Sequence, residues 1–225
     1  MTPIQQFPAW LLPGLLLCSF HSFAQGADTA SAINRIQELI PVEIQGIRVN
    51  DHSPYAVSNI GEQEIREQNQ GREIPYLLNQ TPSVVISSDA GAGIGYTGIR
   101  IRGTDAARIN FTINGVPVND AESQAAIFVD FPDLLSSTHS IQIQRGVGAS
   151  TNGSGAFGAS INLSNLSQSQ EAFAEINSSA GSFNTFKNTI EAGTGLLKGG
   201  FQFDLRLSKI SSDGYIERAA SDLKA

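Results

Sequence analysis

Three glycines have the spacing of a nucleotide-binding loop. Gly153-x-Gly155-x-x-Gly158 matches the glycine fingerprint of dinucleotide-binding proteins letter by letter. That fingerprint needs a strand before it, a helix after it and an acidic residue about 20 positions further on. Here the strand-like run 161–163 follows instead of a helix. We therefore interpret the glycines as tight turns that let neighbouring strands pack closely, and we expect no cofactor.

Side chains that could act as catalytic groups are scarce. His21 lies in a segment that we expect to be removed, which leaves only His52 and His139. No His–carboxylate cluster, His-Glu-x-x-His helix or Gly-x-Ser-x-Gly turn can be assembled from these spacings. We interpret Asp130 and Asp133 as solvated or helix-capping carboxylates and not as an acid–base pair. The sequence therefore predicts a protein that is not an enzyme and holds no metal.

The composition indicates a folded chain without a nucleic-acid footprint. The 225 residues are 40% hydrophobic and 16% charged, which allows one sizeable globular domain or a smaller domain with an appendage. The formal net charge is −7, and no run of Lys and Arg occurs. Because nucleic-acid binding needs clustered basic side chains, we expect no nucleic-acid partner.

The first 24 residues have the pattern of a secretory signal peptide. They contain no charged side chain, and the apolar run 9–20 is followed by the small-x-small sequence 22–24. We predict a signal peptide over residues 1–24, cleavage after Ala24 and export. A hydrophobic N-terminal strand or helix of the fold is the alternative. Lipid attachment at Cys18 is disfavoured, because Leu17 precedes it where such sites usually have a small residue.

The residues before the glycines alternate apolar and polar side chains, as half-buried strands do. The run 109–113 alternates, breaks at Asn114-Gly115 and resumes at 116–118, which predicts a hairpin because Asn and Gly both tolerate positive φ. The runs 141–145 and 161–163 predict two further strands on either side of a Gly-rich loop. Together these runs predict a small mixed sheet.

Shorter elements are expected on the N-terminal side of the hairpin. Residues 57–65 and 74–78 indicate short helical or turn segments, the second with Pro75 near its start, where a missing N–H costs little. Residues 84–86 indicate a strand. The expected architecture is therefore a sheet with short helices.

The order of these elements resembles the plug domain of the TonB-dependent outer-membrane receptors. The resemblance covers roughly residues 39–207, and it depends on the ordered set of motifs and not on any single one. It implies an α+β plug domain, a small mixed sheet with short helices, followed by the start of a transmembrane antiparallel β-barrel. The plug motif residues that it implies are Arg100, Arg102, Gly103, Asn114, Gly115, Arg145, Gly146, Gly153, Gly155 and Gly158.

The resemblance also implies a TonB box, a segment that a TonB partner pairs with. Such a segment must be extended and weakly held, so that its free backbone groups can join a partner sheet as an added edge. An ordinary edge strand of the plug is the alternative. The box-like residues are Pro41, Val42, Glu43, Ile44, Gln45, Gly46, Ile47, Arg48 and Val49.

A glycine-rich loop follows the predicted strand 84–86. In the family such a loop often faces the extracellular vestibule, so it is either a candidate substrate-facing loop or a plain connector. Its candidate residues are Asp89, Gly91, Gly93, Gly95 and Tyr96.

Beyond Ser164 the pattern changes to that of barrel strands. Residues 201–207 alternate large apolar with polar side chains, and the runs 186–192 and 172–180 are weaker copies. The edge of a soluble β-sandwich is the alternative. Residues 166–225 are too few for the roughly 22 strands of the family's barrels, so we expect an N-terminal fragment. We further expect residues 50–165 to fold alone, with 170–210 at most a detached meander.

These expectations combine into one functional prediction. The chain is divided into a signal peptide (1–24), a flexible leader with the box (25–49), the plug (50–165) and the first barrel strands (166–225). The resemblance implies a receptor of the bacterial outer membrane that imports a scarce, bulky solute, such as a ferric siderophore, haem or a cobalamin-like compound. Its expected partners are TonB, outer-membrane lipid and that solute. A stand-alone soluble plug-like binding module of the periplasm is the alternative.

Overall fold

The computed structural model describes residues 48–49, 53–148, 152, 155–165 and 169–225. The predicted signal peptide, the predicted leader up to residue 47 with the box-like residues 41–47, His52 and Gly153 therefore lie outside the described residues.

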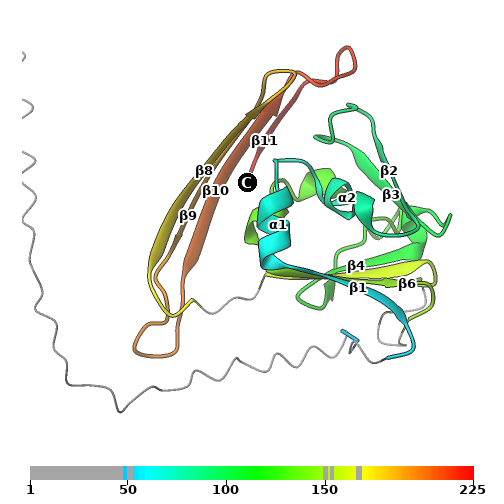
Figure 1. Cartoon of the computed structure of the whole chain (residues 1–225), viewed down its shortest axis with the longest axis horizontal. Coiled ribbons are helices and arrows are strands. Elements are labelled where there is room, and N and C mark those ends of the chain that lie inside the picture. The colour runs from blue at the N-terminus through cyan, green and yellow to red at the C-terminus, as the bar shows by residue number, and fades with distance from the viewer. Residues whose placement is uncertain (1–47, 50–52, 149–151, 153–154, 166–168) are drawn as a thin grey trace, which may run out of the picture. The chain divides into compact units, whose positions relative to one another are not determined.

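A five-stranded sheet forms the centre of the plug region (Figure 1). Its order is β1 (Ala56–Gly61), β6 (Ser140–Arg145), β7 (Ala159–Ser164), β4 (Ile109–Ile113) and β5 (Val116–Pro117). The β4–β7 pair is parallel and the other pairs are antiparallel, which confirms the predicted mixed sheet. Asn114 and Gly115 have φ of 51° and 84°, as the predicted hairpin turn requires.

One face of this sheet is apolar and carries the core. Ile141, Ile143, Ile161 and Leu163 are almost fully buried, because adjacent strands place them side by side under the helices. Among the described residues the helices are α1 (Glu62–Gln68) and α2 (Ile74–Leu77), with the short 3-10 helices η1 (Leu78–Gln80), η2 (Ala106–Arg108), η3 (Phe128–Asp130) and η4 (Leu134–Ser137). Pro75 lies in the first turn of α2, as expected.

The segment 57–65 differs from its expected helical or turn structure. Its first part is strand β1, and the helix α1 begins only at Glu62. Only Ile60 of β1 is buried, because β1 is an edge strand paired with β6 alone. The strand therefore lacks the alternation that would have identified it.

A separate two-stranded sheet holds the glycine-rich loop. It consists of β2 (Val84–Ser88) and β3 (Thr97–Ile101), which pair antiparallel, and the loop 89–96 joins them. The predicted strand at 84–86 is therefore confirmed.

A four-stranded antiparallel meander follows the plug region (Figure 1). It contains β8 (Phe173–Gly181), β9 (Thr185–Gly193), β10 (Asp204–Ser212) and β11 (Ser221–Lys224). The expected strand 201–207 begins three residues late, because the β9–β10 ladder ends at the Asp204–Gly193 pair. Phe201 and Phe203 belong to the connection between the strands.

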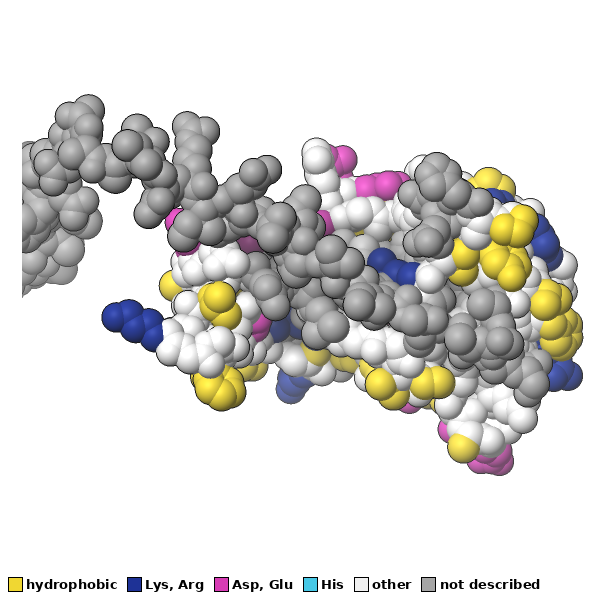
Figure 2. Space-filling view, turned by 90° about the horizontal axis from the view of Figure 1, so that it is seen from below, with side chains coloured by type: hydrophobic (Ala, Val, Ile, Leu, Met, Phe, Trp, Pro, Cys, Tyr) yellow, Lys and Arg dark blue, Asp and Glu magenta, His cyan; other side chains and the backbone are white. Residues whose placement is uncertain are grey.

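The two faces of the meander differ in polarity. One face exposes large apolar side chains, while the other buries polar ones against the plug region. The exposed apolar set includes Ile176, Phe186, Ile190, Leu205 and Leu207, and the buried polar set is Lys187, Thr189, Ser208 and Ser212. The expectation of a detached meander is therefore wrong, since its polar face packs on the plug. In the view of Figure 2 exposed hydrophobic side chains gather in several separate groups.

Candidate functional site

The face of the five-stranded sheet opposite the core is polar. Asn59, Gln142, Asn162 and Thr112 form a row across β1, β6, β7 and β4, because each is the register partner of the next. The Thr112 hydroxyl donates to Asn162 Oδ1 at 2.7 Å, and Gln142 Nε2 donates to Asn59 Oδ1 at 3.0 Å. This face is suited to hold a polar chain segment.

The end of the box-like segment lies on this polar face. Gln142 Oε1 accepts from the Val49 N–H at 2.8 Å, and Gln142 Nε2 donates to the Val49 carbonyl at 2.9 Å. The Arg48 guanidinium donates to the hydroxyl and the carbonyl of Ser140, at 2.8 and 3.0 Å, and to the Asn162 carbonyl at 3.2 Å. Neither Arg48 nor Val49 lies in a strand. Hydrogen bonds that involve the Gln142 and Arg48 side chains therefore hold these two residues on the sheet.

The loop 89–96 depends on its glycines. Gly91, Gly93 and Gly95 have φ of 73°, 82° and 96°, a region that other residues rarely adopt. A Cβ on Gly93 would lie 2.8 Å from the Tyr76 ring, and one on Gly91 would lie 2.9 Å from the Tyr215 ring. The glycines therefore let the loop pack closely on two aromatic rings, while Tyr96 at its end stays 65% exposed.

Glu73, at the start of α2, fixes the base of this loop. Its backbone N–H donates to the Gly93 carbonyl at 2.9 Å, and its carboxylate accepts from the Thr97 hydroxyl at 2.5 Å. Burial raises the pKa of Glu73 to about 7, although the Thr97 hydrogen bond acts in the opposite direction. Glu73 was not among the candidate residues that the sequence indicated. A signal existed, since it is the charged residue directly before the apolar run 74–78.

A hollow of about 670 Å³ lies between this loop and the β8–β9 hairpin. Arg72 lies over the Tyr76 ring at 5.6 Å, and Phe183 meets Tyr215 edge to face at 5.4 Å. The Arg72 cation attracts a negatively charged group of a ligand, and aromatic rings stack with a planar one. The lining residues are Gln70, Arg72, Tyr76, Gly91, Ala92, Ile94, Ser179, Ala180, Gly181, Ser182, Phe183 and Thr185.

A buried cluster around Asp133 joins the plug region to the meander. Asp133 Oδ1 lies 2.6 Å from Lys187 Nζ, and Oδ2 accepts from the Thr189 and Ser208 hydroxyls at 2.7 and 2.6 Å. Arg206 also donates to the Asp133 carbonyl. Burial would raise the pKa of Asp133, but the Lys187 ammonium and the Ser208 and Ser136 hydroxyls hold it below its usual value.

The expectation of a solvated or helix-capping pair is therefore wrong for Asp133. Asp133 occupies the position before η4, but its buried carboxylate accepts no backbone N–H of that helix. Its partners are side chains of β9 and β10 and the Ser136 hydroxyl. Asp130 is exposed, as expected. The signal for the cluster was Lys187, a charged residue at an inward position of an alternating strand.

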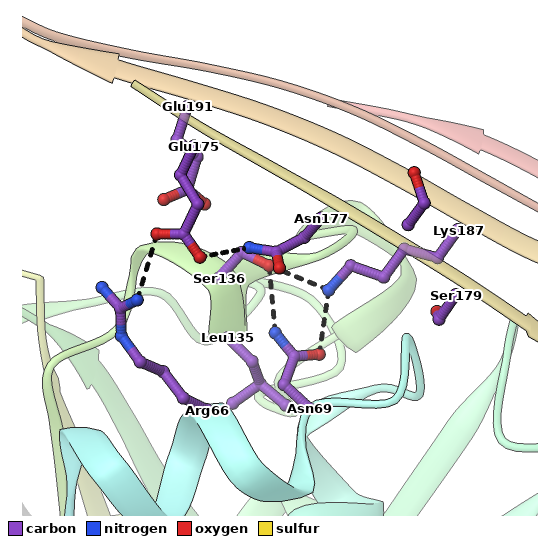
Figure 3. A pocket seen from close by; sticks show the side chains of 10 residues that line it. Arg66, Asn69, Leu135, Ser136, Glu175, Asn177, Ser179, Lys187 and Glu191 are labelled. Atoms are coloured by element: carbon purple, nitrogen blue, oxygen red, sulfur yellow. Dashed lines mark hydrogen bonds and ion pairs between the residues drawn. The ribbon is translucent and has the colours of Figure 1, made fainter. Parts of the chain in front are cut away.

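Figure 3 shows the cavity beside this cluster, about 170 Å³ in volume. Lys187 reaches from β9 to Asn69 Oδ1 at 3.1 Å and to the Ser136 hydroxyl at 2.9 Å. Arg66 of α1 contacts Glu175 of β8 at 3.2 Å on another side of the cavity. Polar side chains of the plug region and of the meander therefore meet around this cavity.

The plug motif residues divide between two places. Arg102, Gly146 and Gly158 come together, since Gly146 N–H donates to the Gly158 carbonyl at 2.7 Å and a Cβ on Gly146 would collide with the Arg102 guanidinium. Arg145 is nearby in sequence and donates to the Pro82 carbonyl at 3.2 Å. Asn114, by contrast, bonds the Leu163 carbonyl at the far end of β7. Arg100 and Gly103 are exposed near Arg102 in sequence, Gly115 shares the turn with Asn114, and Gly155 has open space around it.

Comparison with known proteins agrees with this architecture. A family model described as the TonB-dependent receptor plug domain matches residues 49–160. The chain belongs to the TonB-dependent receptors. The vitamin B12 transporter BtuB of Vibrio cholerae is 27% identical to this receptor chain over 183 residues, which are 79% of the chain and 29% of BtuB.

Solved structures with the same fold are also receptors and transporters. The ferric citrate transporter FecA in its unliganded form gives a TM-score of 0.61 at 22% identity, covering 76% of this chain and 28% of FecA. The copper transporter OprC gives 0.55 at 17% identity, covering 74% of this chain and 25% of OprC. The predicted fold class, a plug domain followed by the first barrel strands, is confirmed.

The curated relatives are much longer than this receptor chain, which spans 29% of their length. They are transporters, which confirms the prediction that the protein is not an enzyme. Within the part of the chain that the structure describes, no helix is long and apolar enough to cross a membrane.

Proposed function

We propose that the protein is an outer-membrane receptor that imports a scarce, bulky solute in a step energised by TonB. The division into signal peptide (1–24), leader with the box (25–49), plug (50–165) and first barrel strands (166–225) is part of this proposal. The observation that carries it is the polarity of the meander. Its inner face packs polar side chains on the plug, while its outer face exposes apolar side chains that nothing in the described chain covers.

Outer-membrane lipid is the proposed neighbour of the outer face. Strands of membrane barrels alternate between lipid-facing apolar and inward-facing polar residues. Ile190 and Leu207 are register partners on the outer face, whereas Thr189 and Ser208 are buried partners on the inner face. A soluble β-sheet would instead need a second apolar layer over the outer face.

The loop 89–96 is the proposed solute-contacting apex of the plug. It lies beside the β8–β9 turn and the β10–β11 connection, since Tyr215 N–H donates to the Ala90 carbonyl at 3.0 Å. The β8–β9 turn and the β10–β11 connection lie at one end of the meander, and the chain enters β8 at the other end. A chain that enters the barrel from the periplasmic side would therefore present this loop toward the outside. Arg72, Tyr76 and the exposed Tyr96 favour an anionic or aromatic group on the solute.

The solute class follows by analogy with the relatives, whose names refer to vitamin B12, ferric citrate and copper. We propose a metal chelate such as a ferric siderophore, haem or a cobalamin-like compound. TonB is the proposed energising partner, binding residues 41–49 as an added strand.

Two measurements test the proposal. The full-length protein, expressed with its own leader, should fractionate with outer membranes. Its mobility in gel electrophoresis should differ between heated and unheated samples. Cells that express it should accumulate one member of a panel of cyanocobalamin, haem, ferric citrate and ferric siderophores only when TonB is present. A protein that stays in the soluble periplasmic fraction would instead support the stand-alone binding module.

A further inference from the structure

The connection 194–203 between β9 and β10 is long and rich in apolar side chains. It lies at the end of the meander where the chain enters β8, because β8, β9 and β10 are antiparallel to their neighbours. The turn between β8 and β9, at the other end, comprises only residues 182–184. Outer-membrane barrels have short turns on the periplasmic side and longer loops outside, so a connection of this length at the entry end needs an explanation.

The connection continues the two-faced pattern of β10 past the end of the ladder. Phe201 and Phe203 are 68% and 65% exposed, as is Leu205 at 61% on the outer face of β10. Gln202, between the two rings, points the other way. Its amide donates to Asp204 Oδ2 at 2.7 Å, and both residues line a hollow of about 730 Å³ between the meander and the plug region. The outer apolar column therefore extends to Phe201.

Hydrogen bonds keep the two flanks of the connection side by side. The Thr194 N–H donates to the Phe203 carbonyl at 3.0 Å, and the Phe203 N–H donates to the Thr194 hydroxyl at 3.1 Å. Nearer the tip, the Leu197 N–H donates to the Phe201 carbonyl at 2.9 Å. The connection is therefore an irregular extension of the β9–β10 hairpin, drawn in orange below β9 and β10 in Figure 1.

A polar row limits the apolar column at its other end. Ser178, Asn188 and Lys209 are register partners across β8, β9 and β10, and all three are exposed on the outer face. The next row toward the connection contains Ile190 and Leu207, which are apolar. A lysine facing lipid is costly near the bilayer midplane and tolerated near the interface. The polar row therefore marks one boundary of the hydrocarbon layer.

From this boundary, the ladder alone is too short to cross the hydrocarbon layer. A strand tilted by about 40° rises roughly 2.6 Å per residue along the membrane normal, and the apolar band of such barrels is about 25 Å tall. Residues 204–208 of β10 therefore supply only about 13 Å of this height. Residues 201–203 add about 8 Å, so the column that begins at Phe201 nearly completes the band.

The backbone of the connection sets how deep it can lie. Residues 198–199 form a turn outside any ladder, and irregular backbone is not tolerated where it faces the hydrocarbon core. Exposed phenylalanine rings, in turn, gain free energy by leaving water. Only the boundary between headgroups and acyl chains satisfies both requirements. There the exposed Lys198 can reach the lipid phosphates while the rings contact acyl chains.

We propose that the connection 194–203 is a lipid-binding element in the periplasmic leaflet of the outer membrane. Phe201 and Phe203 contact the acyl chains of phospholipids, and Lys198 lies at the level of their phosphates. The inference rests on the proposed function, in which the outer face of the meander contacts lipid. It adds that the bilayer is centred near Leu205, toward one end of the ladder, and not on the middle of β10.

The test measures depth in the bilayer at single positions of the full-length protein. Phe201→Cys, Leu205→Cys and Lys209→Cys are each spin-labelled and reconstituted in vesicles of phosphatidylethanolamine and phosphatidylglycerol. Accessibility to oxygen, which concentrates among acyl chains, is compared with accessibility to a nickel chelate, which stays in water. Depth should be greatest at 205 and similar, but smaller, at 201 and 209. Gln202→Cys is the matched control, and its oxygen-to-nickel ratio should be at least fivefold below that of Phe201→Cys.

The label at Leu207→Cys separates this inference from the proposed function. If 207 lies in lipid while 201 is in water, the connection is an ordinary periplasmic loop and only the inference fails. If 201, 205 and 207 are all in water, the membrane assignment of the outer face fails as well. A label at 201 that neither oxygen nor nickel reaches would mean that protein covers the rings, which also overturns the inference.

A cross-linking measurement in cells covers the case in which a labelled variant does not reconstitute. The photoreactive residue p-benzoylphenylalanine replaces Phe201 with little change of shape, and the same replacement at Phe157, an exposed ring of the plug, is the control. Irradiation should join phospholipid to residue 201 and not to residue 157. Adducts of residue 201 with protein alone, or equal lipid adducts at both positions, would contradict the proposal.

Discussion

The side-chain amide of Gln142 bonds both backbone groups of Val49, at 2.8 Å to the N–H and 2.9 Å to the carbonyl. A primary amide offers the same donor and acceptor as a peptide group, so Gln142 replaces a neighbouring strand for this one residue. The end of the box-like segment is thus held in place without becoming part of the sheet.

Gln142→Glu should loosen this contact. A carboxylate accepts from the Val49 N–H but can donate neither to the Val49 carbonyl nor to Asn59 Oδ1, so the bond that holds the Val49 carbonyl is lost together with the bond to Asn59. A net hydrogen bond contributes about 1 kcal/mol, so exchange of the Val49 amide should accelerate about fivefold. The exposed Gln80→Glu is the control, and equal rates in both variants would show that the amide does not hold the segment.

Ile44→Pro tests the box. Proline removes an N–H donor and fixes φ, so pairing with a TonB strand should fail and energised uptake should stop, while solute binding to intact cells continues. Ile44→Ala keeps the donor and should retain uptake. If Ile44→Pro imports at the parental rate, residues 41–49 are not the TonB box.

Glu73 should make the loop 89–96 sensitive to pH. Its pKa is about 7 in the folded protein against an ordinary value of 4.5, so the folded state binds the proton more tightly. The contribution of Glu73 to the stability of the loop is therefore largest below about pH 4.5, decreases as the pH rises toward 7, and stays small above pH 7. The total change is on the order of 3 kcal/mol.

Hydrogen exchange of Gly93 and Gly95, corrected for its intrinsic pH dependence, checks this sign. The loop should open more readily at pH 8 than at pH 5.5 in the parent, and equally at both values in Glu73→Gln. Slower opening at pH 8 in the parent would mean that the carboxylate is stabilised in its charged form.

Ile190→Arg tests the outer face of the meander. An arginine on the lipid-facing side of a barrel strand costs about 2–4 kcal/mol near the middle of the bilayer. The amount of heat-modifiable protein in outer membranes should therefore fall severalfold. Val85→Arg, at an exposed position of β2, is the control and should not change this amount. If Ile190→Arg inserts to the same extent as the parent, the outer face of the meander faces water and not lipid.

Local signals explain what the sequence predicted correctly. Asn114-Gly115 specifies its hairpin by its own backbone preferences, and the alternation around Ile141 and Ile161 follows from one buried sheet face. The two errors in strand assignment have different causes. β1 lacks alternation because only Ile60 is buried, and Phe201 alternates in sequence beyond the end of the ladder.

The contacts of the candidate sites could not be predicted in the same way. Asp133 has ordinary neighbours in sequence, and its partners lie on strands that begin at Thr185 and Asp204. Whether a carboxylate is solvated or buried depends on what folds over it, and this information is not local. The same holds for Glu73, whose environment is made by a loop some 20 residues later in the chain.

The pairing of β1 with β6, and of β4 with β7, has a consequence for the order of folding. Each pair joins segments separated by a long stretch of chain, and such non-local contacts form slowly. Two of the three interior strands of the sheet, β6 and β7, are also the last of its strands to be synthesised. A nascent chain that ends before Ser164 therefore has no complete sheet to collapse onto. Delayed folding of this kind would leave the plug unfolded until β7 has been synthesised, and truncation at residue 145 should leave the Ile60 and Phe111 amides unprotected.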